Sequence, residues 1–299
     1  MVVHAENVSR RYGETVALSG VSFSVPAGEI FGIIGPNGAG KTTLIRALTG
    51  TTDAEGDVSV FGRPPREIDR GRIGLLPQEF APADRLTARE LLAYYAGLYD
   101  GARDPDAVLA DVGLTDSAGT FYENLSGGQK RRACVGTALV NEPELLILDE
   151  PTTGIDPTGR RELWRLIEKL ADGGTTVLLT THYMDEAETL ADRVGLLADG
   201  ELVALGSPEE LIARHGGDSR LVIEAEDEPE AAATLAAAGY ERLPGEDGIA
   251  VPAGPKEIPA VVEVLEESGV GYEGLVWRQP SLEDVYVALT GRDAPEGAA

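Results

Sequence analysis

The chain has 299 residues, 42% of them hydrophobic, so it is long enough for one large domain with a smaller one appended. Its formal net charge of −26 disfavours nucleic acid as a partner, because such a surface repels phosphates. The acidic residues are spread along the chain, which favours a halophilic source; an acidic protein from a GC-rich genome is the alternative.

Cysteine content excludes a protein held by intrachain disulfides, and hydropathy disfavours a membrane-spanning one. Cys134 is the single cysteine, so an intrachain disulfide is excluded, and its apolar neighbours favour a small core residue over a nucleophile. No continuous apolar stretch approaches ~18 residues, and the first residues lack the pattern of a signal peptide. We therefore expect a cytoplasmic chain whose contact with any membrane is peripheral.

The first two thirds of the chain alternate between strand and helix patterns. Gly28–Ile34 is predicted to be a buried strand that leads through a glycine-rich loop into a helix at Thr42–Thr49. Residues 87–140 are mainly helical, and Leu145–Leu148 is a continuous apolar run typical of a buried parallel strand. The later helix, strand, helix and strand pair are predicted at Gly159–Leu170, Thr175–Thr181, Met184–Ala191 and Val194–Ala204. This alternation predicts a largely parallel sheet.

The composition changes near His215–Asp218, where a second domain is expected to begin. The pattern beyond this point is approximately βαββαβ with one helix added, which predicts a small α+β domain with a ferredoxin-like arrangement. Residues 291–299 are predicted to be frayed. In chain order the strands and helices are predicted at Leu221–Glu224, Pro229–Ala238, Ile249–Val251, Lys256–Ser268, Val270–Trp277 and Ser281–Leu289.

The glycine-rich loop matches the P-loop pattern GxxxxGK[ST] between a strand and a helix. Its glycines allow backbone N–H groups to turn inward around an anion, and the helix that follows adds its positive end. A glycine turn between two elements is the plainer alternative. The residues are Gly35, Pro36, Asn37, Gly38, Ala39, Gly40, Lys41 and Thr42, followed by Thr43, which can reach an inner phosphate.

A second glycine pair precedes another predicted helix in the sequence LSGGQ. Ser126 and Gln129 have the spacing of a capping box, so a well-capped helix is one interpretation. A cap does not need Gly127 and Gly128, however, and exposed amides at a helix start also bind anions. Two phosphate-binding helix starts in one chain suggest a nucleotide held between two copies.

Taken together, these motifs resemble those of the ATPase subunit of an ABC transporter, over residues 1 to about 217. The family's Walker A, Q-loop, LSGGQ signature, Walker B, D-loop and switch histidine occur here in the family's order. An aromatic residue also precedes these motifs, at the position where the family stacks an aromatic ring on adenine. The matching residues are Tyr12, Gly35–Thr43, Gln78, Leu125–Gln129, Leu145–Glu150, Asp156 and His182.

The resemblance implies an α/β P-loop NTPase fold of the ABC ATPase type. Residues 1–217 would hold a parallel-sheet core, an antiparallel β subdomain and a helical subdomain at about 79–140. Residues 218–299 would form the small α+β domain. The tail from Gln279 to Gly291 is similar to the end of ATPases of the ABC-2 type, many of which serve exporters.

The resemblance also implies the ligands ATP and Mg²⁺ and a role for each motif. Asp149 and Glu150 end a buried strand, where α/β sheets place their sites, although two acidic residues that merely end a strand are the alternative. Glu150 would orient the attacking water as general base, and His182 would contact the γ-phosphate or Glu150. Thr42, Gln78 and Asp149 would hold Mg²⁺, and Tyr12 would stack on adenine. A second copy would supply Ser126, Gly127, Gly128, Gln129 and Asp156.

The expected partners are a second ATPase copy, identical or similar, and separate membrane subunits of the ABC-2 type. The chain would then act at the cytoplasmic face of the membrane and power transport, with export favoured. A soluble ABC ATPase that drives a cytoplasmic complex, such as iron–sulfur cluster assembly, is the alternative. A P-loop kinase or GTPase is disfavoured, because neither has an LSGGQ segment and the guanine-reading Asn-Lys-x-Asp is absent.

Overall fold

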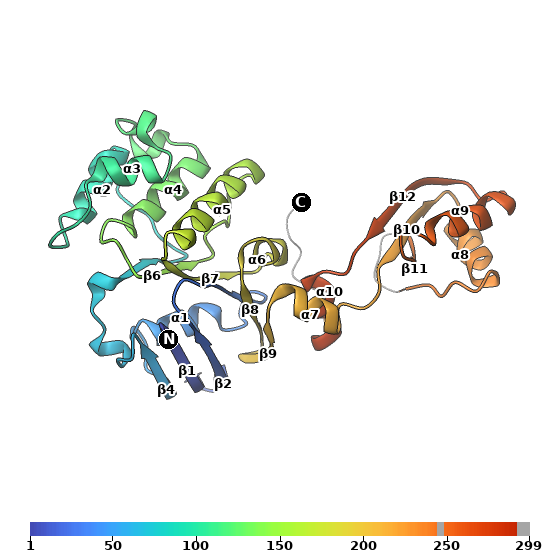
Figure 1. The fold of residues 1–299 in the computed structure, drawn as a ribbon, viewed down its shortest axis with the longest axis horizontal. Helices are drawn as coiled ribbons and strands as arrows, with labels where there is room; N and C mark the ends of the chain where they lie inside the picture. Colours follow the sequence, from blue (N-terminus) through green and yellow to red (C-terminus); the bar gives the residue numbers. More distant parts are fainter. Residues whose placement is uncertain (244–247, 292–299) are drawn as a thin grey trace. The chain divides into compact units, whose positions relative to one another are not determined.

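The computed structural model describes residues 1–243 and 248–291, which divide into two compact units (Figure 1). The first unit is Met1–Pro208, and the second begins at Glu209. The division thus falls before the change expected after residue 217, because most of helix α7 (Pro208–His215) belongs to the second unit. Gly216, which follows α7, approaches Pro280 so closely that an added side-chain carbon would lie 3.0 Å from it.

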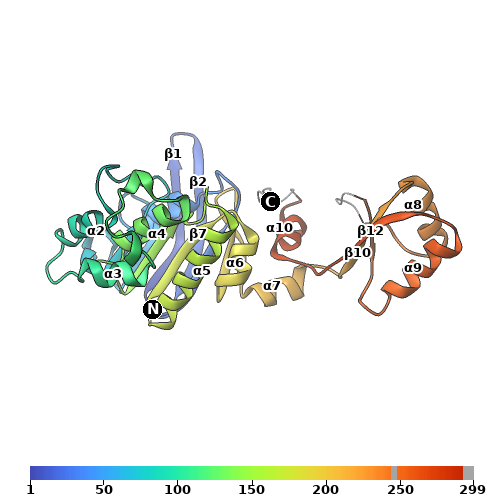
Figure 2. The same ribbon diagram turned by 90° about the horizontal axis from the view of Figure 1, so that it is seen from above.

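A six-stranded sheet in the order β5-β6-β7-β3-β8-β9 forms the centre of the first unit (Figures 1 and 2). All neighbouring strands are parallel except β8 and β9. Every residue of β3, β6 and β7 is buried, which explains why their sequences are apolar runs without alternation. The strands are β3 (Ile30–Ile34), β5 (Ile73–Leu76), β6 (Leu145–Asp149), β7 (Thr176–Thr181), β8 (Arg193–Ala198) and β9 (Glu201–Gly206).

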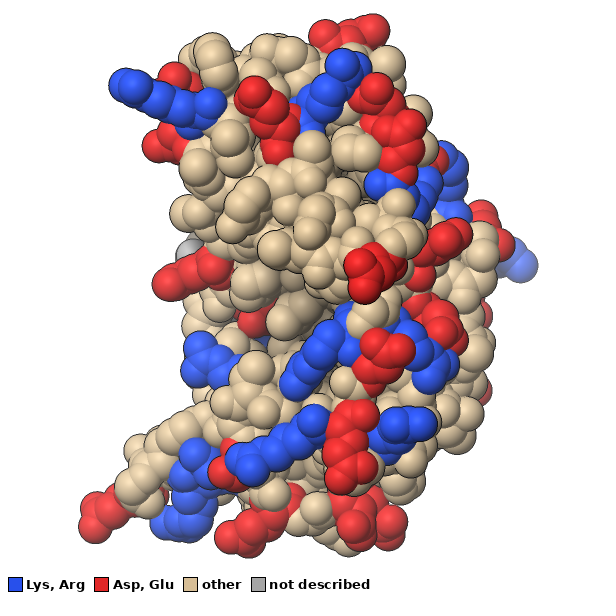
Figure 3. All heavy atoms as spheres, turned by 90° about the vertical axis from the view of Figure 1, so that its left-hand side faces the viewer, with Lys and Arg blue, Asp and Glu red and all other residues tan. Residues whose placement is uncertain are grey.

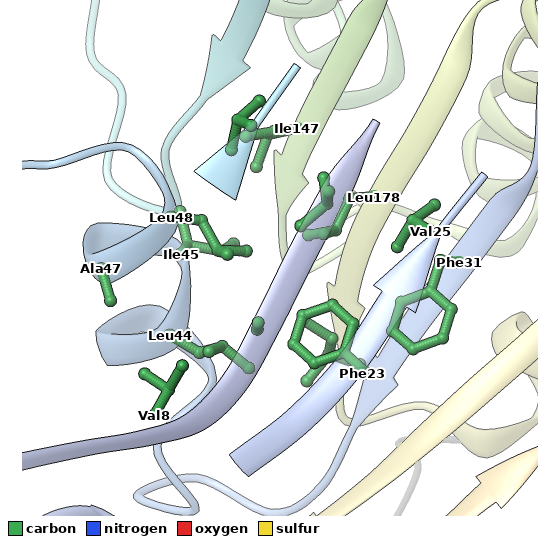
Figure 4. Close-up of a cluster of buried hydrophobic side chains, with 14 of the residues drawn as sticks. Val8, Phe23, Val25, Phe31, Leu44, Ile45, Ala47, Leu48, Ile147 and Leu178 are labelled. Carbon is green, nitrogen blue, oxygen red and sulfur yellow. The ribbon is translucent and has the colours of Figure 1, made fainter. Parts of the chain in front are cut away.

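A second, antiparallel sheet in the order β2-β1-β4 shares its core with helix α1 (Lys41–Leu48). The Phe23 ring of this sheet stacks on Phe31 of the central sheet, with centroids 5.0 Å apart. In Figure 4 the α1 side chains Leu44 and Leu48 belong to the same buried cluster. This packing fixes the start of α1 next to the end of β3. The strands are β1 (Val3–Tyr12), β2 (Thr15–Val25) and β4 (Glu55–Val60).

Helices α2, α3 and α4 of the first unit lie between β5 and β6 in the chain, α5 follows β6, and α6 follows β7. Helix α4 packs against both α2 and α5, and α2 and α4 each begin with a complete capping box. Cys134 is buried in α4, as the sequence predicts. The helices are α2 (Ala88–Ala96), α3 (Pro105–Asp111), α4 (Gly127–Thr137), α5 (Pro157–Asp172) and α6 (Met184–Leu190), and short 3₁₀ turns lie at Pro65–Glu67, Arg70–Arg72, Thr115–Ser117 and Tyr122–Asn124.

Basic and acidic side chains are interspersed on the face of the first unit that includes α2, α3 and β4 (Figure 3). Several arginines of the first unit form ion pairs with exposed acidic side chains. These pairs include Arg66–Asp53, Arg72–Glu144 and Arg89–Asp106.

The second unit contains a three-stranded antiparallel sheet in the order β11-β10-β12. The ferredoxin-like expectation of four strands is therefore wrong for the described residues. A single bridge between Leu243 and Ala250 stands at the edge of β11, where the remaining strand would pair. The elements are β10 (Arg220–Ala225), α8 (Glu228–Ala237), β11 (Ile249–Pro252), α9 (Ile258–Glu267), β12 (Tyr272–Arg278) and α10 (Leu282–Thr290).

The two helices of this α/β arrangement, α8 and α9, bury apolar side chains against the sheet. Leu235 of α8 and Leu265 of α9 share one core cluster with Leu221 and Ile223 of β10. Of the predicted frayed segment, residues 292–299 lie outside the described residues.

Candidate functional site

The P-loop lies between β3 and α1, as the sequence predicts. Gly40 is the residue before α1 and has φ 110°, a left-handed conformation that favours glycine. Gly35 lies so close to β8 that an added side-chain carbon would be 2.2 Å from the carbonyl oxygen of Leu197. The two glycines are therefore required by backbone geometry. Together they leave the first amides of α1 available to an anion.

Lys41 lies across the P-loop. Its Nζ donates to the carbonyl oxygens of Gly35 (2.7 Å) and Pro36 (3.1 Å) and lies 3.1 Å from Glu150 Oε1. Both members of this ion pair are buried, each with 5% of its side chain exposed. Burial lowers the pKa of Lys41, although the Glu150 carboxylate opposes the shift. An ammonium group is thus held at the centre of the anion site.

Four residues meet at the Glu150 carboxylate, and three of them, Lys41, Gln78 and His182, are predicted site residues. Gln78 Nε2 donates to Glu150 Oε2 at 3.0 Å, and Thr153 Oγ1 donates to the same oxygen at 3.3 Å. His182 Nδ1 lies 3.4 Å from Oε2, without the angle of a hydrogen bond. With Lys41 on Oε1, the carboxylate connects the P-loop, the Q-loop and the switch histidine.

The backbone at Glu150 is unusual. Its φ is 49°, a left-handed conformation that is uncommon for a residue with a side chain. Its N–H donates to the carbonyl oxygen of Thr180 at 3.1 Å, which ties the end of β6 to β7. Such strain persists only where the surrounding structure holds it, and it is concentrated at functional sites.

Two cavities border the P-loop. One, of about 370 Å³, is lined by loop and α1 residues together with Gln78 and Glu150. The other, of about 420 Å³, is lined by Thr42, Gln78 and Asp149 among others. The P-loop and α1 residues of the first cavity are Asn37, Gly38, Gly40, Lys41, Thr42 and Thr43.

The oxygen donors that border these cavities suit a hard cation. Asp149 is 2% exposed, and its Oδ1 accepts a hydrogen bond from Thr180 Oγ1 at 2.5 Å. Thr42 and Gln78 each line both cavities. A carboxylate, a hydroxyl and an amide oxygen are ligands that Mg²⁺ accepts, with its remaining positions left to phosphate and water.

Tyr12 ends β1 and lies beside the P-loop helix. Its hydroxyl is 3.4 Å from Thr52 Oγ1, and hydrogen bonds, first with Thr52 and also with Thr43, lower its pKa. The Arg10 guanidinium lies 4.6 Å from the ring centroid, and the residue is 42% exposed. Tyr12 lines neither P-loop cavity but presents an aromatic ring close to them.

The LSGGQ segment forms the predicted capping box. Ser126 N donates to Gln129 Oε1 at 2.9 Å, and Gln129 N donates to Ser126 Oγ at 3.3 Å. Ser126 and Gly127 are nevertheless exposed, and they line neither P-loop cavity. Gly128 packs against Gly159, whose N–H donates at 3.4 Å to Asp156, the cap of α5. Within one chain, this set is separate from the P-loop.

Arg131 is a further residue at this site, and the sequence did not predict it. Its guanidinium donates to the carbonyl oxygens of Pro151 (2.5 Å), Glu150 (2.7 Å) and Asp149 (3.2 Å). Burial lowers the pKa of Arg131. The residue therefore fixes the backbone on both sides of Glu150 from the LSGGQ helix. No local pattern in the sequence around Arg131 signals these contacts.

Comparison with known proteins agrees with this geometry. A family model described as ABC transporter matches residues 18–153. A daunorubicin resistance ATP-binding protein of Streptomyces coeruleorubidus is 38% identical over 304 residues, which cover 97% of this chain and 96% of the relative. The chain belongs to the family of ABC transporter ATP-binding proteins. It is therefore an ATP-binding protein with ATPase activity, which confirms the predicted enzyme class.

Other members show how far the similarity to this ABC ATPase extends. A Nod factor export ATP-binding protein of Rhizobium meliloti (strain 1021) is 38% identical, with 98% of this chain and 89% of the relative covered. The solved dimeric structure of an ATP-binding cassette in a post-hydrolysis state, bound to ADP and Pi, is 28% identical. It superposes with a TM-score of 0.60 over 69% of this chain and 98% of the cassette. These matches confirm the predicted fold class.

No helix of this ABC ATPase within residues 1–243 and 248–291 has both the length and the apolar character needed to cross a lipid bilayer.

Proposed function

We propose that this chain is the ATP-hydrolysing subunit of an exporter whose membrane-spanning subunits are separate chains. The observation that carries the hydrolytic role is the convergence of Lys41, Gln78 and His182 on the buried Glu150 carboxylate beside the P-loop. The export role is supported by relatives that are named for drug resistance and for Nod factor export.

In the proposed reaction, the triphosphate lies on the P-loop amides, with Lys41 at the β- and γ-phosphates and Thr43 at an inner phosphate. Glu150 accepts a proton from the attacking water, and His182 contacts the γ-phosphate from the end of β7. Thr42, Gln78 and Asp149 would hold Mg²⁺, which would supply positive charge to stabilise the phosphates. Tyr12 stacks its exposed ring on the adenine.

We further propose that two copies close around two nucleotides. Ser126 and Gly127 are exposed at the start of a helix but do not reach the P-loop of their own chain, so a second copy is the geometry that uses them. The dimeric cassette with bound ADP and Pi supports this arrangement. Each site would be completed by residues of the partner subunit, namely the partner's Ser126, the partner's Gly127, the partner's Gly128, the partner's Gln129 and the partner's Asp156.

Ser126→Ala is expected to lower ATPase activity about tenfold or more, because a hydrogen bond to a charged phosphate is lost. It also removes a helix cap, which costs about 1 kcal/mol of stability. Ser281→Ala is a matched control, since Ser281 caps α10 in the same capping-box geometry. The measurements are steady-state ATPase rate and thermal unfolding. Equal ATPase rates for the two variants would contradict the composite site.

The proposed membrane partner is a permease of the ABC-2 type, which would place the chain at the cytoplasmic face of the membrane. Exposed apolar side chains support a docking role for the helical region. Tyr94 and Leu98 near the end of α2 are 61% and 62% exposed, and Leu75 in β5 is 37% exposed. Isolated apolar residues are ordinary on a surface, but this group lies around the segment that follows Gln78.

Affinity-tagged chain purified from its own membranes is expected to retain an integral membrane protein of about six helices. Leu98→Glu is expected to reduce that recovery, because a charge is buried at the interface without a partner. Val203→Glu in β9, which alters a 37% exposed apolar residue elsewhere, is expected to leave recovery unchanged. If the tagged chain were recovered with a soluble iron–sulfur assembly complex and without a membrane protein, the result would favour the alternative function.

A further inference from the structure

Glu186 is a buried acidic residue that the proposed reaction does not use. It lies in the first turn of α6 with 0% of its surface exposed, and burial raises the pKa of its carboxyl group. It lines neither P-loop cavity and therefore touches no reacting atom. A carboxyl group buried this completely requires hydrogen-bond partners, and those partners indicate its role.

Three donors from three different segments meet at Glu186. Thr152 Oγ1 donates to Oε2 at 3.1 Å, and Trp164 Nε1 donates to Oε1 at 2.9 Å. The Thr181 hydroxyl also forms a hydrogen bond with the carboxyl group. One acidic side chain thus joins the segment after β6, helix α5 and the end of β7.

Two of these donors lie within two residues of a residue of the proposed reaction, and the third belongs to the helix that Asp156 caps. Thr152 is two residues after Glu150, and Thr181 immediately precedes His182. The Thr181 hydroxyl also accepts the N–H of Tyr183 at 3.0 Å, so it holds the backbone on both sides of His182. Trp164 belongs to α5, which begins at its cap, Asp156.

A further contact on the same face of α5 reinforces this arrangement. Arg160, one turn before Trp164, lies with its guanidinium 4.4 Å from the centroid of the Tyr183 ring. It also lies 3.6 Å from Asp185, the residue before Glu186. The segment that carries His182 is therefore attached to α5 at two successive turns.

We propose that Glu186 is a positioning residue that holds Glu150, His182 and the start of α5 in one geometry. This inference rests on the proposed function, because it matters only if Glu150 and His182 act on ATP. Small displacements of reacting groups slow a reaction strongly, so a residue outside the site can control its rate. The donors make Glu186 the common anchor of both catalytic segments.

A purely structural role for Glu186 makes different predictions. Loss of a buried hydrogen bond would then lower stability without changing the rate of the folded enzyme. Thr137 offers the matched comparison: it is 6% exposed, and its hydroxyl donates to Cys134 O at 2.7 Å in α4. Thr137→Val therefore measures how the loss of a buried threonine hydroxyl by itself changes the stability and the kcat of the protein.

The experiment compares Glu186→Gln, Thr152→Val and Thr181→Val with Thr137→Val in the full-length chain. Each of the first three changes keeps the shape of the side chain and removes part of the hydrogen-bond set. We expect kcat to fall about tenfold to 100-fold, because Glu150 and His182 lose their alignment. KM and the Kd for ATP are expected to stay within about twofold of the parent, because the P-loop is untouched.

A cycle with His182→Ala tests whether the effect passes through His182. Thr181→Val is expected to have little further effect on kcat once His182 is absent, because the two changes act as one unit. Additive losses in this cycle would contradict a relay from Thr181 to His182. The inference would be overturned if the folded variants kept the parent kcat, as Thr137→Val is expected to do. These variants are Glu186→Gln, Thr152→Val and Thr181→Val.

Glu150→Gln, assayed in parallel, separates the failure of this inference from the failure of the proposed function. If Glu150→Gln loses hydrolysis while the Glu186→Gln and threonine variants keep parent kcat, only the positioning role is wrong. If Glu150→Gln itself hydrolyses ATP at the parent rate, the proposed reaction is wrong, and the positioning role is overturned with it.

Discussion

Glu150→Gln is expected to lower kcat for ATP hydrolysis by about 10²–10⁴-fold, the contribution usual for a general base. The amide has nearly the same shape as the carboxylate, so its oxygen can still accept from Lys41 Nζ, which lies 3.1 Å from Glu150 Oε1. What it loses is the capacity to take a proton from water. ATP binding is therefore expected to persist, and the bound nucleotide holds two copies together.

The measurements are single-turnover hydrolysis and size-exclusion chromatography with ATP and Mg²⁺. The expected result is a dimer that forms with ATP and does not dissociate by hydrolysis. Glu142→Gln is the matched control, because Glu142 has a left-handed backbone with φ 51° and lies on the surface. It removes the same charge and should keep the parent rate. Parent activity in Glu150→Gln would show that another group is the base.

Lys41→Ala is expected to weaken ATP binding by about 100-fold, since it removes a charged hydrogen-bond donor from the phosphates. The variant has a second effect in the nucleotide-free protein. Glu150 is 5% exposed and would lose the cation beside it, which would leave a buried carboxylate without its ion-pair partner. The variant should therefore be impaired both in ATP binding and in hydrolysis at saturating ATP.

Titration calorimetry with ATP at fixed Mg²⁺ measures the binding effect. Lys169→Ala is the control, because Lys169 is an exposed lysine that pairs with Asp111 at 3.0 Å outside the nucleotide site. Its removal changes the net charge equally and should leave the Kd for ATP unchanged. Unaltered ATP affinity in a folded Lys41→Ala protein would be incompatible with the P-loop assignment.

The elements and motifs of the first unit could be predicted because their signals are local. A fully buried strand has a continuous apolar sequence, as in β6, and a P-loop needs glycines at fixed spacing. The rule that parallel strands present their sites at their carboxyl ends also places Asp149 and His182 at one edge of the sheet.

Other features could not be predicted because they depend on contacts between distant segments. The bonds of Arg131 to the carbonyls around Glu150, and those of Glu186 to three segments, leave no local pattern. The sequence allowed two roles for Ser126, a helix cap or part of an anion site. The capping box forms, and Ser126 is still exposed, so the structure is compatible with both roles. Within the described residues, pairing beside Leu243 is limited to its bridge with Ala250, a contact between distant positions that no local pattern predicts.

The Lys41–Glu150 ion pair has a consequence for the free energy of nucleotide binding. In the proposed reaction, the phosphates would compete with the Glu150 carboxylate for the Lys41 ammonium group, so the measured ATP affinity would include the free energy of separating that pair. The same exchange would set the order of events, because the proposed base would lose its cation only when a nucleotide has taken it. Nucleotide binding and activation of the proposed base would therefore be thermodynamically linked through Lys41.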